Sequence, residues 1–276
     1  MRLCLGSRAF DVTTRALVMG LLDCTTDSQS GIGPTFDIDG LLFRAEQLIA
    51  DGADVLEVGG GSGALLSGGG AGGDVDLLIA AVGALTGRFD VPVSVGAGGA
   101  GVARDAFRAG ASVANDATGF ADPEYLAAAA NAGASVVATH VGAPPQRVGQ
   151  SPVEEDLVAA MCDELVARGR RAEDAGISPE RIMVDAGVDL GKTAGQSAAL
   201  LRASNRLAGL GWPLVVSASN AAFVGAPCEL DIDAPRDAAL SAAALGVALG
   251  ARIVRTRDVR GARRVCDTVG AVLAAT

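Results

Sequence analysis

The sequence contains few aromatic residues and no cluster of basic ones. Seven Phe, one Trp and one Tyr are spread over 276 residues, and acidic side chains outnumber basic ones by 32 to 22. Nucleic-acid-binding surfaces need basic patches, often interleaved with aromatic rings that stack on the bases. The formal net charge of −10 also repels a phosphate backbone. We therefore expect no nucleic-acid partner.

The cysteines form no C-x-x-C pair, and the chain has no long apolar run. The five cysteines are far apart: Cys4, Cys24, Cys162, Cys228 and Cys266. This spacing predicts neither a zinc site nor a disulfide framework and favours a reducing compartment. No uncharged apolar run reaches the roughly 18 residues of a membrane span, and residues 1–10 lack the apolar core of a signal peptide. The sequence thus predicts a cytoplasmic protein with no bound metal and no membrane partner.

The chain does contain eight short, continuous apolar runs separated by helix-like stretches. The runs are RALVMGLL (15–22), ADVLEV (53–58), VPVSV (91–95), ASVAN (111–115), ASVVATH (134–140), RIMVD (181–185), WPLVVSA (212–218) and ARIVRT (251–256). Between them, apolar residues recur at helical spacing. Continuous apolar strands are typical of a parallel sheet covered by helices. Eight strand–helix repeats without a linker predict an α/β protein, a single-domain (β/α)8 TIM barrel over residues 1–276.

Polar residues gather directly after the apolar runs. In a closed barrel the carboxyl ends of all strands meet at one mouth, where barrel enzymes carry their active sites. One of these segments holds a glycine motif: Gly96, Gly98 and Gly101 spell G-x-G-x-x-G, and Asp116 follows about twenty residues later. A dinucleotide fingerprint normally opens the first strand–helix unit of an open sheet, whereas two units precede this motif. We therefore expect no nucleotide cofactor here.

Six segments beside the strand ends resemble, in order and spacing, those of the dihydropteroate synthase family, the pterin-binding barrels of folate synthesis. They are VMGLLDCTTDSQSG (18–31), DGADVLEVGGGS (51–62), AGASVANDATG (109–119), DAGVDLGKT (185–193), SASNAAFVG (217–225) and RTRDV (255–259). The resemblance covers nearly the whole chain. It implies a barrel whose mouth holds a pterin through carboxylates, an Asn and a Lys. Asn115 and Asp185 stand at the places of that Asn and of one Asp.

Several other positions depart from the family's pattern. Gly96 stands where the resemblance implies a second pterin-binding carboxylate, and Asn220 and Ala221 stand in place of an Arg and a Lys. Residues 61–64, which read Gly-Ser-Gly-Ala, lack the Thr and Arg expected to bind pyrophosphate. Each missing donor is worth roughly 2.7–4 kcal/mol of barrier in other enzymes. The departures therefore disfavour the family's transferase reaction and favour a larger or less polar substrate.

Three residues at the strand ends are candidate catalytic groups: Asp23, His140 and Asp185. His140, the only histidine, ends the fifth run and is expected to point toward the mouth. Its unperturbed pKa near neutrality suits acid/base catalysis, although a packing role fits it equally well. Asp23 and Asp185 form a candidate acidic pair, suited to proton transfer if burial raises one pKa. A solvated loop position is the alternative for Asp23.

Other polar residues are candidate binding groups for a small-molecule substrate. They are Asn115, Ser219, Asn220, Arg255, Arg257, Ser62 and Lys192. Arg257 stands where the resemblance implies a His. Lys192 begins the helix after the sixth run without the upstream glycines of a Walker loop, and a solvated lysine is the alternative. Nine of the fifteen residues 59–73 are glycine, which favours a mobile lid or a loop released from an earlier role.

Three functions remain open. The first is a diverged barrel enzyme of specialised metabolism that performs acid/base chemistry on a small polar cyclic or aromatic substrate, such as dehydration, elimination or cyclisation. The second is an authentic synthase that joins a pterin pyrophosphate to p-aminobenzoate and requires Mg²⁺, or a folate-handling methyltransferase with a corrinoid partner. The third is a catalytically silent barrel that binds a pterin or a protein. The resemblance also implies a homodimer, for which the small-residue helix 237–250 offers a face.

Overall fold

Eight parallel strands close into a barrel in the computed structural model, which describes residues 1–24, 37–59, 72–96, 98–116, 118–141, 154–188, 190–217 and 235–275. The strands are β3 (Leu17–Asp23), β4 (Val55–Gly59), β5 (Val93–Gly96), β6 (Val113–Asp116), β7 (Ser135–Thr139), β8 (Ile182–Asp185), β9 (Leu214–Ser217) and β10 (Ile253–Thr256). Their closed order is β10-β3-β4-β5-β6-β7-β8-β9. Each strand overlaps one predicted apolar run, so the predicted (β/α)8 barrel is confirmed.

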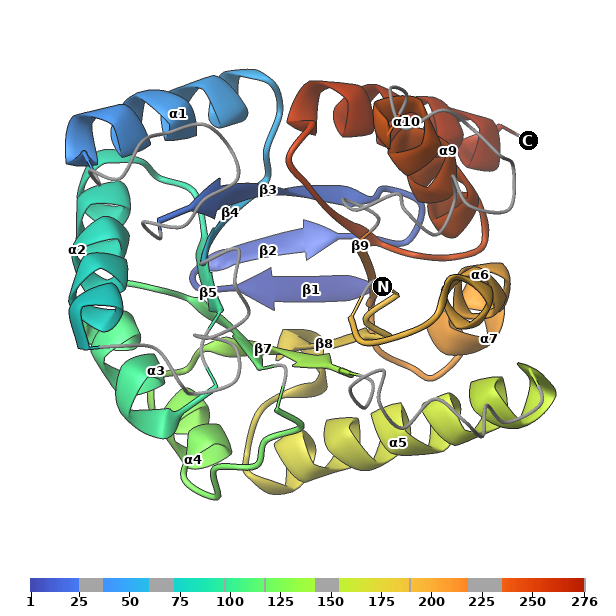
Figure 1. Ribbon diagram of the computed structural model, residues 1–276, viewed down its shortest axis with the longest axis horizontal. Helices are drawn as coiled ribbons and strands as arrows, with labels where there is room; N and C mark the ends of the chain where they lie inside the picture. The colour runs from blue at the N-terminus through green and yellow to red at the C-terminus, as the bar shows by residue number, and fades with distance from the viewer. Residues whose placement is uncertain are drawn as a thin grey trace.

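Helices surround the strands on the outer side of the barrel (Figure 1). They are α1 (Ile38–Ala50), α2 (Gly72–Arg88), α3 (Ala100–Arg108), α4 (Tyr125–Asn131), α5 (Glu154–Asp174), α6 (Ala194–Arg202), α7 (Ser204–Ala208), α9 (Pro235–Ala248) and α10 (Val259–Ala274). Outward strand residues such as Val18 and Val95 share one buried cluster with helix residues such as Leu48 and Ala103. Across the described ranges, no helix is both long and apolar enough to cross a membrane.

An antiparallel hairpin at the N-terminus closes the end of the barrel opposite the mouth. Its strands are β1 (Arg2–Leu5) and β2 (Arg8–Asp11), which cross the centre of the barrel in Figure 1. Ser135 Oγ, at the start of β7, donates to the carbonyl of Cys4 at 2.6 Å. Gly6 in the turn has a φ of +60°, and a Cβ there would lie 2.9 Å from Cβ of Ser112. The sequence pattern did not predict this hairpin.

The inside of the barrel has an apolar half and a polar half. Successive strand residues point to opposite faces, and the inward residues near the amino ends cluster with Leu3, Leu5 and Val12 of the hairpin segment: Leu17, Met19, Val55, Val113, Val137, Met183, Val215 and Ile253. Nearer the carboxyl ends, the inward positions are polar. They are Glu57, Ser94, Asn115, Thr139, Asp185, Ser217 and Arg255, and we call this set the polar layer.

Candidate functional site

Glu57 lies at the centre of the polar layer. Its side chain is almost fully buried, and its two oxygens face different partners. Asn115 Nδ2 donates to Oε1 at 2.8 Å, and Ser94 Oγ approaches the same oxygen at 3.4 Å. Arg255 Nε donates to Oε2 in an ion pair. Four strands, β4, β5, β6 and β10, are therefore joined through one carboxylate.

The orientation of the Asn115 amide follows from these contacts. A carboxylate that forms an ion pair, as Glu57 does with Arg255, can only accept hydrogen bonds, so the amide nitrogen must face it. The amide oxygen then faces Thr139, whose Oγ1 donates to Asn115 Oδ1 at 2.7 Å. An amide has two donor hydrogens and two acceptor lone pairs, and these contacts use one of each. The contacts among the described residues thus leave one donor and one acceptor of Asn115 unused.

Asp185 ends β8 as a buried carboxyl group of the polar layer. Its Oδ1 accepts from the amide of Gly187 at 2.7 Å, and no ion pair among the described residues includes it. Burial raises the pKa of Asp185, while the Gly187 amide and the charges of Arg255 and Lys192 oppose the rise. The carboxyl group is therefore suited to holding a proton closer to neutral pH than an ordinary aspartate.

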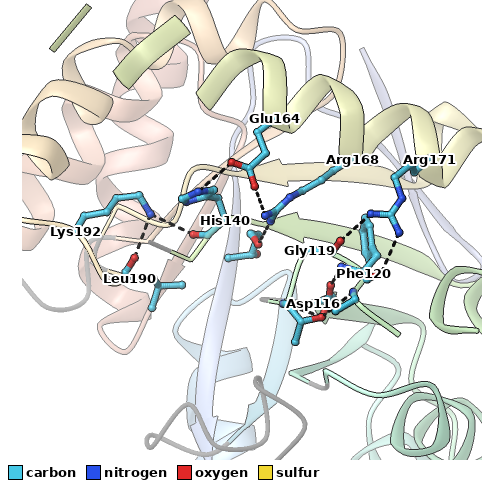
Figure 2. A network of polar contacts seen from close by, with 12 residues as sticks. Asp116, Gly119, Phe120, His140, Glu164, Arg168, Arg171, Leu190 and Lys192 are labelled. Atoms are coloured by element: carbon cyan, nitrogen blue, oxygen red, sulfur yellow. Dashed lines mark hydrogen bonds and ion pairs between the residues drawn. The ribbon is translucent and has the colours of Figure 1, made fainter. Parts of the chain in front are cut away.

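A glycine and a lysine shape the loop that follows Asp185. Gly187 has a φ of +60°, and a Cβ on it would lie 1.9 Å from the carbonyl oxygen of His140. Lys192 Nζ donates to the carbonyl of Gly187 at 2.7 Å. It also donates to the carbonyls of Leu190 at 3.1 Å and His140 at 3.2 Å (Figure 2). Lys192 therefore ties the loop after β8 to the end of β7. It is not the solvated lysine considered from the sequence, and its predicted substrate contact stays a prediction.

The imidazole of His140 faces α5 and not the polar layer. Its Nε2 lies 3.1 Å from Glu164 Oε2, and Arg168 pairs with the same carboxylate while donating to the carbonyl of Thr139 at 2.5 Å (Figure 2). Because Thr139 points inward, strand alternation turns the next residue outward. Burial and then Lys192 lower the pKa of His140 to about 4, against the attraction of Glu164. The predicted orientation toward the mouth is wrong, and the predicted catalytic role is untested.

Asp23 is the last residue of β3 and pairs with Arg257. Nε and Nη2 of Arg257 approach the carboxylate at 3.2–3.3 Å. The Asp23 side chain is 15% exposed and the Arg257 side chain 51%. Asp23 is therefore a strand residue neutralised at the rim of the mouth, not a solvated loop residue. Its predicted role as the acidic partner of Asp185 across the pocket stays a prediction.

The acidic residues near the glycine motif bind protein groups. Asp116 is buried and accepts from the amide and hydroxyl of Thr118 at 2.9 and 2.7 Å, and from the amide of Phe120. The first amide of α3, that of Ala100, donates to Asp122 Oδ2 at 2.8 Å. In a dinucleotide site the acidic residue and the helix amides are the groups that bind the cofactor. Here Asp116 and the first helix amide both bind protein groups; the absence of a nucleotide cofactor stays a prediction.

The segment that follows β6 is also held from α5. Arg171 donates to the carbonyls of Gly119 at 3.0 Å and Phe120 at 2.9 Å, as Figure 2 shows. Phe120 has a φ of +58°, in the left-handed region that is unusual for an aromatic residue. Together with Arg168 and Glu164, Arg171 makes α5 the helix that fixes the ends of β6 and β7.

Several sequence predictions fall outside the described residues: Ser62, Ser219, Asn220, Ala221 and most of the glycine-rich segment 59–73. Conversely, the sequence analysis did not single out Glu57, Ser94, Thr139 or Ser217. An acidic residue inside the apolar run ADVLEV was the one available signal for Glu57. In the described ranges, no three His, Cys, Asp or Glu side chains are gathered as a metal ion requires.

A closed (β/α)8 barrel with buried carboxylate, amide and guanidinium groups at its mouth defines a class of barrels that bind small polar molecules. The chain belongs to the family described as "Pterin binding enzyme", whose model matches residues 19–257. The resemblance seen in the sequence is thereby confirmed.

Two curated relatives and one solved structure show how close this similarity is. "Inactive dihydropteroate synthase 2" of Mycobacterium leprae is 34% identical over 268 residues, with 94% of this chain and 91% of the relative covered. "Dihydropteroate synthase" of Synechocystis sp. is 32% identical over 278 residues, with 97% and 93% covered. The structure of Yersinia pestis dihydropteroate synthase with a sulfonamide drug matches with a TM-score of 0.88 at 28% identity, with 100% of both chains covered. A relative named as an inactive synthase and one named as a synthase are thus about equally similar to this chain.

Proposed function

We propose that this chain is a diverged pterin-family enzyme that binds a small polar cyclic or aromatic molecule at the barrel mouth and moves a proton on it through Asp185. Dehydration, elimination and cyclisation are the reaction classes that such a proton transfer serves. The observation that carries the proposal is the position of Asp185: a buried carboxyl group, held by one backbone amide, with a raised pKa.

Asp185 and Asn115 together supply the contacts that a nitrogen-containing ring needs. A carboxylate can accept two parallel hydrogen bonds from a ring N–H and an exocyclic amine. Asn115 adds one donor and one acceptor beyond those used by Glu57 and Thr139. The expected ligand is therefore a planar ring with adjacent N–H donors and a carbonyl or ring-nitrogen acceptor.

The cations of the mouth argue against the synthase reaction. A departing pyrophosphate needs cationic or amide donors directed at its developing charge. Arg255 is already paired with Glu57, and Arg257 with Asp23. Gly96 and residues 61–64 lack the groups that the family resemblance implies, and one relative carries the name of an inactive synthase. We propose that Mg²⁺ is needed only if pyrophosphate chemistry is retained.

Calorimetric titration of the protein with 6-hydroxymethylpterin, guanine and a simple pyrimidinone tests ring recognition. At least one ring is expected to bind, and Asp185→Asn is expected to weaken it by tenfold or more, because a two-point hydrogen bond is lost. Asp90→Asn is the matched control, since Asp90 is exposed and pairs with Arg8 of the hairpin. Failure of the folded wild-type protein to bind any of the three rings would contradict the proposal.

A turnover assay separates the proposal from the two alternatives. Incubation with a 6-hydroxymethylpterin pyrophosphate, p-aminobenzoate and Mg²⁺ is expected to give no pteroate product. Product formation would instead support the synthase. A silent ring-binding or partner-binding barrel, favoured by the name of the inactive relative, predicts ring binding without turnover of any bound ring.

We further propose that residues 1–276 act as one domain, in a cytoplasmic homodimer with a biosynthetic role. Support for the dimer is limited to α9, where Leu245 is 44% exposed amid small residues. Sedimentation of the purified protein measures the oligomeric state, and a monomer at micromolar concentration would contradict the dimer.

A further inference from the structure

Glu57 is a buried acid whose partners all come from other strands. It lies in β4 and is 1% exposed. An ionised carboxylate at such a position is strongly destabilising unless it is paired and hydrogen-bonded. The three groups that meet this need are Ser94 of β5, Asn115 of β6 and Arg255 of β10. None of them is near Glu57 in sequence, so the arrangement exists only in the closed barrel.

Glu57 determines which way the Asn115 amide points. A flipped amide would set Asn115 Oδ1 against Glu57 Oε1, placing two acceptors at the 2.8 Å that the present hydrogen bond spans. It would also present the amide nitrogen to Thr139 Oγ1, which now donates. The ligand-binding face of Asn115 is therefore fixed by Glu57.

Glu57 also determines the position of the Arg255 guanidinium group. Arg255 Nε is bound to Glu57 Oε2, and Nη1 reaches Ser217 Oγ at 3.4 Å. Burial on its own lowers the pKa of Arg255, and Glu57, followed by Asp185 and Asp23, raises it, so the guanidinium stays charged. Asp185 is near enough to feel that charge but shares no ion pair with it among the described residues. Besides Glu57, the described carboxylates whose charge acts on Arg255 are Asp185 and Asp23.

We propose that Glu57 is a positioning residue: by holding Arg255 and Asn115 together, it prevents Arg255 from pairing with Asp185 and so keeps Asp185 available to exchange a proton with the ligand. The inference rests on the proposed function of Asp185. According to the inference, ring binding by Asn115 and proton transfer by Asp185 both depend on Glu57, although Glu57 contacts neither the ring nor the transferred proton.

The charges around Asp185 make this role measurable without a substrate. Among the described charged groups, Arg255 and Lys192 lower the pKa of Asp185 and Glu57 raises it. Lys192 is held by three backbone carbonyls from the loop after β8 and the end of β7, so its contribution is the same in every variant of Glu57. A change in the titration of Asp185 then reports on Glu57 and Arg255.

The experiment is a carbon-13 NMR titration of the Asp185 carboxyl group, assigned by its absence in Asp185→Asn. In Glu57→Gln, Arg255 loses its Glu57 partner and Asp185 loses a negative neighbour, so the pKa of Asp185 is expected to fall relative to wild type. In Glu57→Gln/Arg255→Gln both members of the ion pair are gone, and the pKa is expected to return toward the wild-type value. Arg255→Gln alone is expected to shift it upward.

A further variant separates the charge of Glu57 from the length of its side chain, and a second one serves as a control. Glu57→Asp keeps the charge but is one methylene shorter, so the pKa of Asp185 should stay closer to wild type than in Glu57→Gln while ring binding weakens. Glu180→Gln is the matched control, because Glu180 lies beside Cys4 and Arg2 at the hairpin end, and it should leave Asp185 unchanged.

An unchanged pKa of Asp185 in Glu57→Gln, or the same pKa in the single and double variants, would overturn the inference. If Glu57→Gln does not fold, Arg255→Gln and the double variant decide the question, since they predict an upward shift and no shift respectively. Failure of the proposed function is recognised separately: no ring binds the wild-type protein, whatever Asp185 does when Glu57 is changed.

Discussion

Nε2 of His140 lies 3.1 Å from Oε2 of Glu164, yet His140 is uncharged at neutral pH. Burial and the cations Lys192 and Arg168 outweigh Glu164 and bring the pKa of His140 down to about 4. The imidazole is therefore a neutral hydrogen-bonding group between the end of β7 and α5. The lowered pKa of His140 affects the stability of the fold at acidic pH.

Stability is expected to fall as the pH is lowered from about 6.5 to about 4. An unfolded histidine takes up a proton below pH 6.5, whereas His140 in the folded protein does so only near 4. The unfolded state then binds more protons in this window, at a cost of up to roughly 1.4 kcal/mol per pH unit. Urea unfolding of wild type and His140→Gln at several pH values isolates the effect. Parallel pH profiles for the two proteins would contradict it.

Arg171 is expected to stabilise the segment after β6, where Phe120 has a positive φ. Arg171→Ala removes two hydrogen bonds to the carbonyls of Gly119 and Phe120, and the free energy of unfolding should fall by roughly 1–2 kcal/mol. Hydrogen exchange at the Phe120 amide should also become faster. Arg170→Ala is the matched control, since Arg170 is the preceding helix residue and 70% exposed. Equal effects of the two substitutions would show that the carbonyl contacts contribute nothing.

Lys192→Met should both destabilise the fold and raise the pKa of Asp185. The ammonium group satisfies the carbonyls of His140, Gly187 and Leu190, and its loss should cost roughly 2–3 kcal/mol. Lys192 also lowers the pKa of Asp185, so removing the charge moves that pKa upward. Denaturant unfolding and carboxyl NMR measure the two effects. A variant with wild-type stability and titration would mean that Lys192 is solvated after all.

Gly187→Ala should be among the most damaging single-methyl substitutions in the chain. The new Cβ would lie 1.9 Å from the His140 carbonyl oxygen at a φ of +60°, and the amide that holds Asp185 must move. Gly176→Ala, at a φ of +92° with open space around the Cβ, shares only the backbone strain, which costs about 1–3 kcal/mol. Thermal unfolding should show a clearly larger loss at Gly187. Equal losses at the two glycines would refute the steric argument.

The barrel strands could be predicted from sequence because helices cover their outer face and make each run continuously apolar. The N-terminal hairpin could not, since its four-residue strands RLCL and RAFD carry too little pattern. The family resemblance located Asn115 and Asp185 in the polar layer. Glu57 was missed because its partner Arg255 is 198 residues away. The orientation of His140 depends on whether Thr139 faces inward or outward, and this cannot be read from the sequence at the end of a strand.

The N-terminal hairpin closes the amino end of the barrel. Leu3, Leu5 and Val12 fill the amino end and pack on the apolar inner residues above them, so the polar layer lies between a filled amino end and the carboxyl ends of the strands. A molecule that binds at the polar layer, as proposed, would reach it from the carboxyl end of the barrel, where Asp23 and Arg257 form an ion pair. Under the proposed function, substrate would enter and product would leave past this one rim, so a bound product would block the next substrate.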